Sequence, residues 1–192
     1  MLNKEATADD ILAGGFDKVL LATGSVPFVP PIAGIKQDHV VTANDILLGK
    51  AKAEGSGVVI GGGLVGCETA LHINETIKDV TVVEMLGDIL AVADHCPNND
   101  MSLRHMMKCS SIRVEVSAKV KEIGENTLTY EKDGQTFTIP ADTVVVASGF
   151  RAYDPLSEAL EDKVDFKVVG DAVKPGKIID ATRDAYQWIR LQ

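Results

Sequence analysis

The sequence has only three cysteines, an odd number. Cys67, Cys96 and Cys109 form no C-x-x-C motif. This argues against a disulfide framework, a zinc site of closely spaced thiolates and a dithiol redox centre, including that of a disulfide reductase. The four histidines have no carboxylate partner at metal-ligand spacing, so we expect no metal ion. Unpaired thiols are typical of a reducing compartment, and we expect a cytoplasmic location.

An excess of positive charge and long apolar runs are also missing. Nineteen lysines and arginines stand against 28 aspartates and glutamates, for a net charge of −9. An acidic chain lacks the electrostatic basis for binding nucleic acid or an anionic membrane surface. No stretch approaches the roughly 18 continuous apolar residues of a membrane span, and no apolar signal segment is present at the N-terminus. We therefore expect small molecules or other proteins as partners.

Apolar runs of strand length do occur, bounded by Gly, Pro or Asp. A near-continuous apolar run is typical of a strand buried on both faces of a parallel sheet, which predicts an α/β fold with a Rossmann-like parallel sheet and helices on both faces. The predicted strands span residues 18–22, 57–60, 80–84, 143–147 and 166–169. The predicted helices span residues 9–13, 64–76, 101–109 and 177–191.

Between residues 117 and 140 the pattern changes to short alternating strands, with a hairpin signal at Asp133-Gly134. This predicts an antiparallel β-meander. Two linker-like stretches, residues 26–38 and 149–157, place the domain boundaries near residues 50 and 150. The middle piece, 51–149, is then a continuous domain, and pieces 1–50 and 150–192 are two parts of something else.

A glycine-rich loop, Gly61-Gly62-Gly63-Leu64-Val65-Gly66, follows one predicted strand and opens a predicted helix. In a G-x-G-x-x-G dinucleotide loop, Gly61 permits a sharp turn, Gly63 lets a pyrophosphate approach the backbone, and Gly66 brings the helix close to the sheet. The phosphates then lie at the positive end of the helix. An ordinary strand-to-helix turn is the alternative. Cys67, just inside the helix, is expected to be a small packing residue rather than a reactive thiolate.

An acidic residue, Glu84, ends the next predicted strand. A carboxylate there can accept hydrogen bonds from both adenine-ribose hydroxyls and repels a 2′-phosphate. Met85, Leu86 and Gly87, which follow, offer no cation for a 2′-phosphate. The loop and Glu84 together predict dinucleotide binding with NAD preferred over NADP. The alternative is that Glu84 is merely a solvated strand end.

Five segments in order resemble a known family: ATGSVPFVPPIAG, VVIGGGLVGCETA, VTVVEM, VVVASGFR and VVGDAVKPGKIIDATRDAYQ. Their order resembles the pyridine nucleotide-disulfide oxidoreductases, flavoproteins in which an NAD(P)H domain is inserted into an FAD domain. More narrowly, GLVGCETA, VTVVEM and GDAVKPGKI resemble the C-terminal part of NADH:flavin oxidoreductases with an old-yellow-enzyme-like barrel. That group includes 2-enoate reductase, 2,4-dienoyl-CoA reductase and trimethylamine dehydrogenase.

The resemblance implies a set of cofactor-binding positions and no catalytic acid or base. The glycine loop would bind the NADH pyrophosphate and Glu84 its ribose, with Glu68 near the nicotinamide; for Glu68, a first-turn acid stabilised by the helix dipole remains an equal alternative. Asp171 would bind the ribityl chain of FAD, the alternative being an N-cap-like acid. The implied cofactor-binding residues are Gly61, Gly62, Gly63, Leu64, Val65, Gly66, Glu68, Glu84, Met85 and Gly149 for NAD(H), and Thr23, Gly24, Gly170 and Asp171 for FAD.

Several parts that the resemblance implies are missing from the sequence. Only one G-x-G-x-x-G loop is present, whereas the family's FAD domain begins with its own. We therefore expect an excised or naturally truncated segment: 1–50 as a partial FAD-domain segment, 51–149 as the NAD(H)-binding Rossmann domain, and 150–192 as the FAD-domain return segment. FAD belongs to the intact parent and is not expected to bind this fragment, and FMN and an iron–sulfur cluster belong to the absent barrel.

The function implied by the resemblance is that of the parent protein. NADH would deliver a hydride to FAD, and the electrons would pass to an enoate- or dienoyl-type reductase centre. The partners are nicotinamide dinucleotide and the missing FAD-domain and barrel portions. The fragment alone is expected to be inactive, and apolar surface freed on its flanks would favour a homodimer. The alternative is a non-catalytic nucleotide-binding or electron-transfer module.

Overall fold

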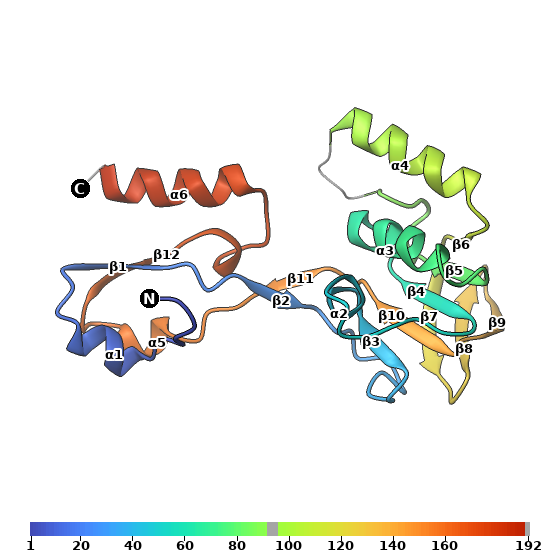
Figure 1. Ribbon diagram of the computed structural model, residues 1–192, viewed down its shortest axis with the longest axis horizontal. Helices are drawn as coiled ribbons and strands as arrows, with labels where there is room; N and C mark the ends of the chain where they lie inside the picture. The colour runs from blue at the N-terminus through green and yellow to red at the C-terminus, as the bar shows by residue number, and fades with distance from the viewer. Residues whose placement is uncertain (92–95, 191–192) are drawn as a thin grey trace. The chain divides into compact units, whose positions relative to one another are not determined.

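The computed structural model describes residues 1–91 and 96–190, which form two compact units (Figure 1). The central unit is Pro27–Gly149. The flanking unit joins Met1–Val26 to Phe150–Gln192. No helix in the described ranges is both long and apolar enough to cross a bilayer.

A five-stranded sheet forms the middle of the central unit, in the order β3-β10-β4-β5-β6. These strands are β3 (Val40–Thr42), β10 (Thr143–Val146), β4 (Gly57–Ile60), β5 (Val80–Val83) and β6 (Arg113–Glu115). All four ladders are parallel. Every residue of β4, β5 and β10 is buried, because both faces of the sheet are covered. The parallel sheet predicted from the continuous apolar runs is therefore confirmed.

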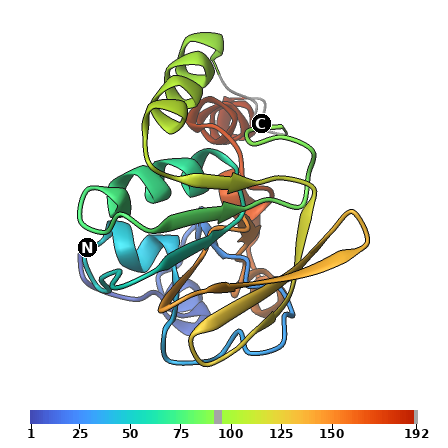
Figure 2. The ribbon, with the colours of Figure 1, turned by 90° about the vertical axis from the view of Figure 1, so that its right-hand side faces the viewer.

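Helices cover one face of this sheet: α2 (Ala43–Leu47), α3 (Leu64–Asn74) and α4 (Pro97–Cys109). Figures 1 and 2 show α3 and α4 on the same side of the strands. The core of this face joins Cys67 and Ala70 of α3 and Leu103 of α4 to Val59 and Val82 of the strands. The alternate strand residues, among them Val58 and Val83, point to the opposite face.

An antiparallel meander covers that opposite face, so the expectation of helices on both faces is wrong. The meander comprises β7 (Ala118–Ile123), β8 (Thr127–Lys132) and β9 (Gln135–Pro140). Val120, Leu128 and Tyr130 pack in one core with Val58 and Val144 of the parallel sheet. The apolar side chains of the meander thus bury the face that a helix would otherwise have to cover.

The meander itself and its hairpin are as predicted. Asp133 has φ 51° and Gly134 has φ 74°. Two consecutive residues with positive φ give the type I′ geometry that matches the twist of a two-residue hairpin. Lys132 pairs with Gln135 across this turn.

The flanking unit is built around a two-stranded parallel sheet of β1 (Lys18–Leu21) and β12 (Asp165–Val168). Its helices are α1 (Ala8–Ala13), α5 (Ser157–Leu160), the 3₁₀ helix η1 (Gly170–Ala172) and α6 (Ile178–Arg190). β2 (Ser25–Pro27) pairs with β11 (Phe150–Ala152) where the chain passes from one unit to the other. Among the residues of this unit that the structure describes, Ile11, Leu21 and Leu160 form the buried core cluster, and no residue of α6 is buried.

The first boundary between the units lies earlier in the chain than the predicted domain boundary near residue 50. Residues 27–50 belong to the central unit, because β3 pairs with β10 and because Ala43 and Ile46 of α2 enter the helical core. The later boundary follows Gly149. The assignment of the pieces to NAD(H)- and FAD-binding domains stays a prediction.

Candidate functional site

The glycine loop connects β4 to α3 at the carboxyl edge of the parallel sheet, where ligands bind in such folds. Gly61 has φ +108°, and a Cβ atom there would lie 2.5 Å from the Ala147 carbonyl oxygen. A Cβ at Gly66 would lie 2.0 Å from the carbonyl oxygen of Gly61. The predicted sharp turn at Gly61 and the close helix approach at Gly66 are therefore confirmed.

Gly63 differs from Gly61 and Gly66, because neither its backbone conformation nor a close neighbour requires a glycine there. Its backbone is extended, with φ −72° and ψ −173°, and a Cβ there would meet nothing within 4 Å. It is the N-cap of α3, and no side chain caps this helix. The first-turn N–H groups of an uncapped helix need an acceptor and lie at its positive end. The space in front of Gly63 can therefore accept an anion.

Glu84 follows β5 directly and is only 8% exposed. Its Oε2 accepts from the Gly62 N–H at 2.6 Å, and its Oε1 accepts from the Leu86 N–H at 2.7 Å. The alternative of a solvated strand end is therefore wrong. Each carboxylate oxygen has a second lone pair, so Glu84 can still accept hydrogen bonds from ligand hydroxyls.

Gly62, the second residue of the motif, has a role that the sequence reasoning missed. A Cβ there would lie 2.9 Å from Cγ2 of Ile89 and 3.1 Å from Cβ of Glu84. The Gly62 carbonyl accepts from the Leu90 N–H at 2.8 Å. The G-x-G-x-x-G motif allows any residue at this second position, so a glycine there was a signal that the protein itself crowds it.

Cys67 lies beneath the loop and is fully buried. Its Sγ donates to the Gly62 carbonyl at 3.4 Å, and burial raises the pKa of the thiol to about 11. A protonated thiol is neither a nucleophile nor a metal ligand. Cys67 is thus a packing residue, as predicted.

Three other predicted residues of the central unit are exposed. Glu68 and Met85 have exposed side chains. Gly149 is exposed with φ +91°, and a Cβ there would meet nothing within 4 Å. The structure thus brings the glycine loop and Glu84 into direct contact, whereas the ligand contacts of Glu68, Met85 and Gly149 stay predictions.

The residues predicted to border FAD lie together within the flanking unit. Asp171 accepts from the Ser25 hydroxyl at 3.2 Å and from the Gly176 N–H at 3.1 Å. Thr23 donates to the Tyr153 carbonyl at 2.5 Å. Gly24 and Gly170 have φ +80° and +63°. A carboxylate suits ligand hydroxyls, but the chain has no second glycine loop for a pyrophosphate. The FAD contacts of Thr23, Gly24, Gly170 and Asp171 stay predictions.

No group of three or more His, Cys, Asp or Glu side chains within residues 1–91 and 96–190 is arranged to hold a metal ion.

Comparison with known proteins identifies what this arrangement is similar to. Residues 3–171 match the family described as pyridine nucleotide-disulphide oxidoreductase. The chain is 37% identical over 188 residues to cinnamate reductase of Clostridium sporogenes, covering 97% of this chain and 28% of that protein. It is 39% identical over 189 residues to NADH oxidase of Thermoanaerobacter brockii, covering 95% of this chain and 29% of that protein.

Solved structures show the same likeness. The structure of 2-naphthoyl-CoA reductase in complex with 2-naphthoyl-CoA matches with a TM-score of 0.87 at 34% identity, covering 97% of this chain and 28% of that one. Thioredoxin reductase of T. acidophilum shares the fold, with a TM-score of 0.67 at 21% identity over 86% of this chain and 61% of that one. The chain spans less than a third of the length of the curated relatives at 37% and 39% identity.

Proposed function

Because this chain belongs to the pyridine nucleotide-disulphide oxidoreductase family, we propose that its central unit binds NADH for hydride transfer to a flavin. The observation that carries the proposal is the open space before Gly63 at the uncapped start of α3, with Glu84 bonded to the same loop. An anion site and a hydroxyl-accepting carboxylate on one loop match the pyrophosphate and ribose of a dinucleotide.

The work of this chain is binding and orientation. The first-turn N–H groups of α3, at Leu64 and Val65, would donate to the pyrophosphate, and the missing side chain at Gly63 lets it approach. The nicotinamide supplies the hydride chemistry when bound, so no side chain of this chain needs to act as acid or base. The exposed Glu68 and Gly149 would border the outer part of the ligand.

Glu84 would set the preference for NADH over NADPH. Its second lone pairs would accept from the ribose hydroxyls, and its charge would repel a 2′-phosphate. We expect NADH to bind at least about tenfold more tightly than NADPH, a difference of about 1.4 kcal/mol.

The activity proposed for the whole protein follows from the relatives. Two of them are named as reductases of cinnamate and of 2-naphthoyl-CoA, and a third as an NADH oxidase. We propose that electrons from NADH pass through FAD to an enoate-type reductase centre, with FMN and an iron–sulfur cluster in a barrel outside this chain. Thr23, Gly24, Gly170 and Asp171 would border an FAD whose pyrophosphate is bound by another part of the polypeptide.

The test is a calorimetric titration of the chain with NADH, using Gly63→Ala as the probe. The backbone of Gly63 is accessible to alanine and its Cβ would have room, so the variant should fold normally. The added methyl occupies the space where the pyrophosphate would lie. The Kd for NADH should rise at least about thirtyfold, equivalent to about 2 kcal/mol.

His72→Ala is the matched control, since His72 is exposed in the last turn of the same helix. This variant should bind NADH as the unchanged chain does. Absence of NADH binding to well-folded unchanged chain would refute the proposed function, and equal binding by Gly63→Ala would refute the placement of the pyrophosphate.

A further inference from the structure

Arg104 of α4 joins a helix to the segment that packs on the glycine loop. Its Nε donates to Asp100 of the same helix at 3.0 Å, and its Nη1 donates to both carboxylate oxygens of Asp88, at 2.9 and 3.0 Å. Its Nη2 donates to the main-chain carbonyl of Ile89 at 2.8 Å. All three guanidinium nitrogens therefore have acceptors, two of them in the segment after β5.

That segment, residues 85–91, contains no helix or strand. Even so, Ile89 and Leu90 are 8% and 3% exposed. The Leu90 N–H donates to the Gly62 carbonyl, and Ile89 fills the space beside Gly62. The Gly62 N–H is thus bonded to Glu84, its carbonyl is bonded to Leu90, and its α-carbon is crowded by Ile89.

We propose that Arg104 is a positioning residue of the dinucleotide site, acting through Ile89 and Leu90 on Gly62. A segment without its own helix or strand hydrogen bonds depends on outside contacts for a single conformation. The fork of an arginine can bind a carboxylate and a carbonyl together, which the single ammonium of a lysine does less well. The inference rests on the proposed function, because it assumes that the loop at Gly62 holds NADH.

The same contacts bear on coenzyme choice. Arg104 is a cation near the proposed ribose-binding segment, where it could serve a 2′-phosphate. Its bonds to Asp88, Asp100 and the Ile89 carbonyl commit it to the protein instead. Its charge therefore positions the segment and does not favour NADPH.

The ion pair of Arg104 and Asp88 is exposed enough that its removal should leave the unit folded. Arg104 and Asp88 have side chains that are 35% and 61% exposed, and exposed ion pairs contribute little to global stability. Loss of Arg104 should therefore loosen residues 86–90 without unfolding the unit, because Leu103 and Met107 still bury α4 in the helical core.

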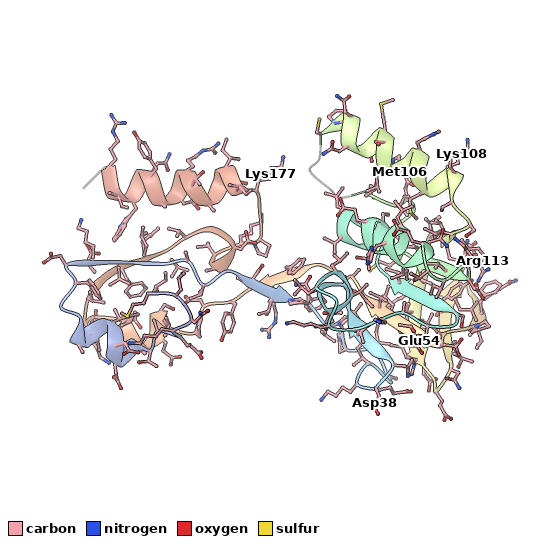
Figure 3. The ribbon with its side chains drawn as sticks, in the orientation of Figure 1. Asp38, Glu54, Met106, Lys108, Arg113 and Lys177 are labelled. Atoms are coloured by element: carbon pink, nitrogen blue, oxygen red, sulfur yellow. The ribbon has the colours of Figure 1, made fainter. Side chains whose placement is uncertain are left out.

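The experiment compares Arg104→Met and Arg104→Lys with a control variant, Arg113→Met. Arg113 also donates to a carboxylate, that of Asp79, and to the Thr81 hydroxyl. It lies at the start of β6 (Figure 3), at the amino ends of the parallel strands, whereas the glycine loop lies at their carboxyl ends. Two measurements are made on each: hydrogen exchange of the Leu90 amide without nucleotide, and the Kd for NADH by calorimetry.

In Arg104→Met, exchange at Leu90 should be at least about tenfold faster and the Kd for NADH about tenfold higher. Arg104→Lys should lie between this variant and the unchanged chain, and Arg113→Met should match the unchanged chain in both. Unaltered exchange at Leu90 in Arg104→Met would overturn the inference, as would faster exchange with an unaltered Kd. Failure of the unchanged chain to bind NADH would instead refute the proposed function and, with it, the role of Arg104 in a nucleotide site.

Discussion

The two units of this chain use the same kinds of element but bury them to very different degrees. In the central unit, three parallel strands are buried along their whole length, between helices on one face and a meander on the other. In the flanking unit, the two paired strands alternate between buried or half-buried and exposed residues, and α6 has no buried residue. Burial on both faces, rather than the presence of strands and helices, is what distinguishes the units.

The two units show that an apolar helix face in the sequence does not by itself mean that the helix is buried. Helix α6 has a clear apolar face at helical spacing, yet Ile178 and Ile189 on it are 85% and 61% exposed. Helix α3 places Cys67, Ala70 and Ile73 in a full core. Because most helix stability in proteins comes from packing, we expect the flanking unit to open far more readily than the central unit.

The largest effects should come from removing a fully buried leucine from each unit. Leu128 in the central unit and Leu160 in the flanking unit both have no exposed surface. Truncation to alanine should cost about 3 kcal/mol at each site. We expect Leu128→Ala to lower the stability of a central unit that stays folded, and Leu160→Ala to unfold the flanking unit, whose core is small.

Hydrogen exchange read by mass spectrometry measures both outcomes on separate peptides. Peptides of residues 27–149 should keep their protection in Leu160→Ala. An equal loss of protection in both units would show that they do not unfold separately.

A smaller effect is expected from crowding the glycine loop. A Cβ at Gly66 would lie 2.0 Å from the Gly61 carbonyl oxygen, so α3 must move away from β4 in Gly66→Ala. Overpacking of this kind costs about 2 kcal/mol. Thermal unfolding of the central unit should shift to lower temperature, whereas Gly63→Ala, where a Cβ has room, should unfold like the unchanged chain. Equal stability of the two variants would contradict the close approach of helix and strand.

Acid should act on each unit through carboxylates with a lowered pKa, among them Asp142 in the central unit and Asp10 in the flanking unit. Hydrogen bonds from the backbone and hydroxyl of Ser56 lower the pKa of Asp142. The hydrogen bond from Lys4 and the N-cap contacts of Thr7 lower the pKa of Asp10 to about 2. A carboxylate whose pKa is lower in the folded than in the unfolded state stabilises the folded state at pH values above its unfolded pKa of about 3.9. This stabilisation disappears as the pH falls through the folded pKa.

Stability curves from pH 5 to pH 2 check this expectation. Asp142→Asn should reduce the acid sensitivity of the central unit, and Asp10→Asn that of the flanking unit. For Asp10 the loss falls between about pH 4 and pH 2. An unchanged acid response in either variant would refute the role assigned to that carboxylate.

The smallest effect is expected on the open face of α6. Ile178 is 85% exposed, so Ile178→Lys should alter the stability of this chain by less than about 0.5 kcal/mol. The measurement is the exchange protection of peptides from residues 150–190. A loss of protection comparable with that of Leu160→Ala would mean that this face is covered in solution, and the contrast between the units would then be smaller than the structure indicates.

Sequence reasoning succeeded where a local pattern is compatible with a single backbone structure. The all-buried valines of β4, β5 and β10 required a parallel sheet, and Asp133-Gly134 required a hairpin. The turn at Gly61 and the close contact at Gly66 followed from the motif alone. Each of these depends on neighbours in sequence or on a single backbone preference.

The misses concern contacts between distant segments. The alternating pattern around Val120 and Leu128 predicted the strands of a meander but could not reveal that their apolar face lies on the parallel sheet. Arg104 on α4 and Ile89 after β5 are 15 residues apart and meet only through tertiary packing. Nothing in a helical arginine indicates which carbonyl it will bind.

The bonds of Glu84 also limit how this protein could be re-engineered or could evolve. The carboxylate that would choose the coenzyme is also the acceptor for two main-chain amides, those of Gly62 and Leu86. Replacing it by a smaller or cationic residue, the obvious route to NADPH use, would leave both amides without that acceptor. A change of coenzyme would therefore require a second mutation that supplies a new acceptor for these amides. Coenzyme preference and the conformation of the loop thus depend on the same side chain.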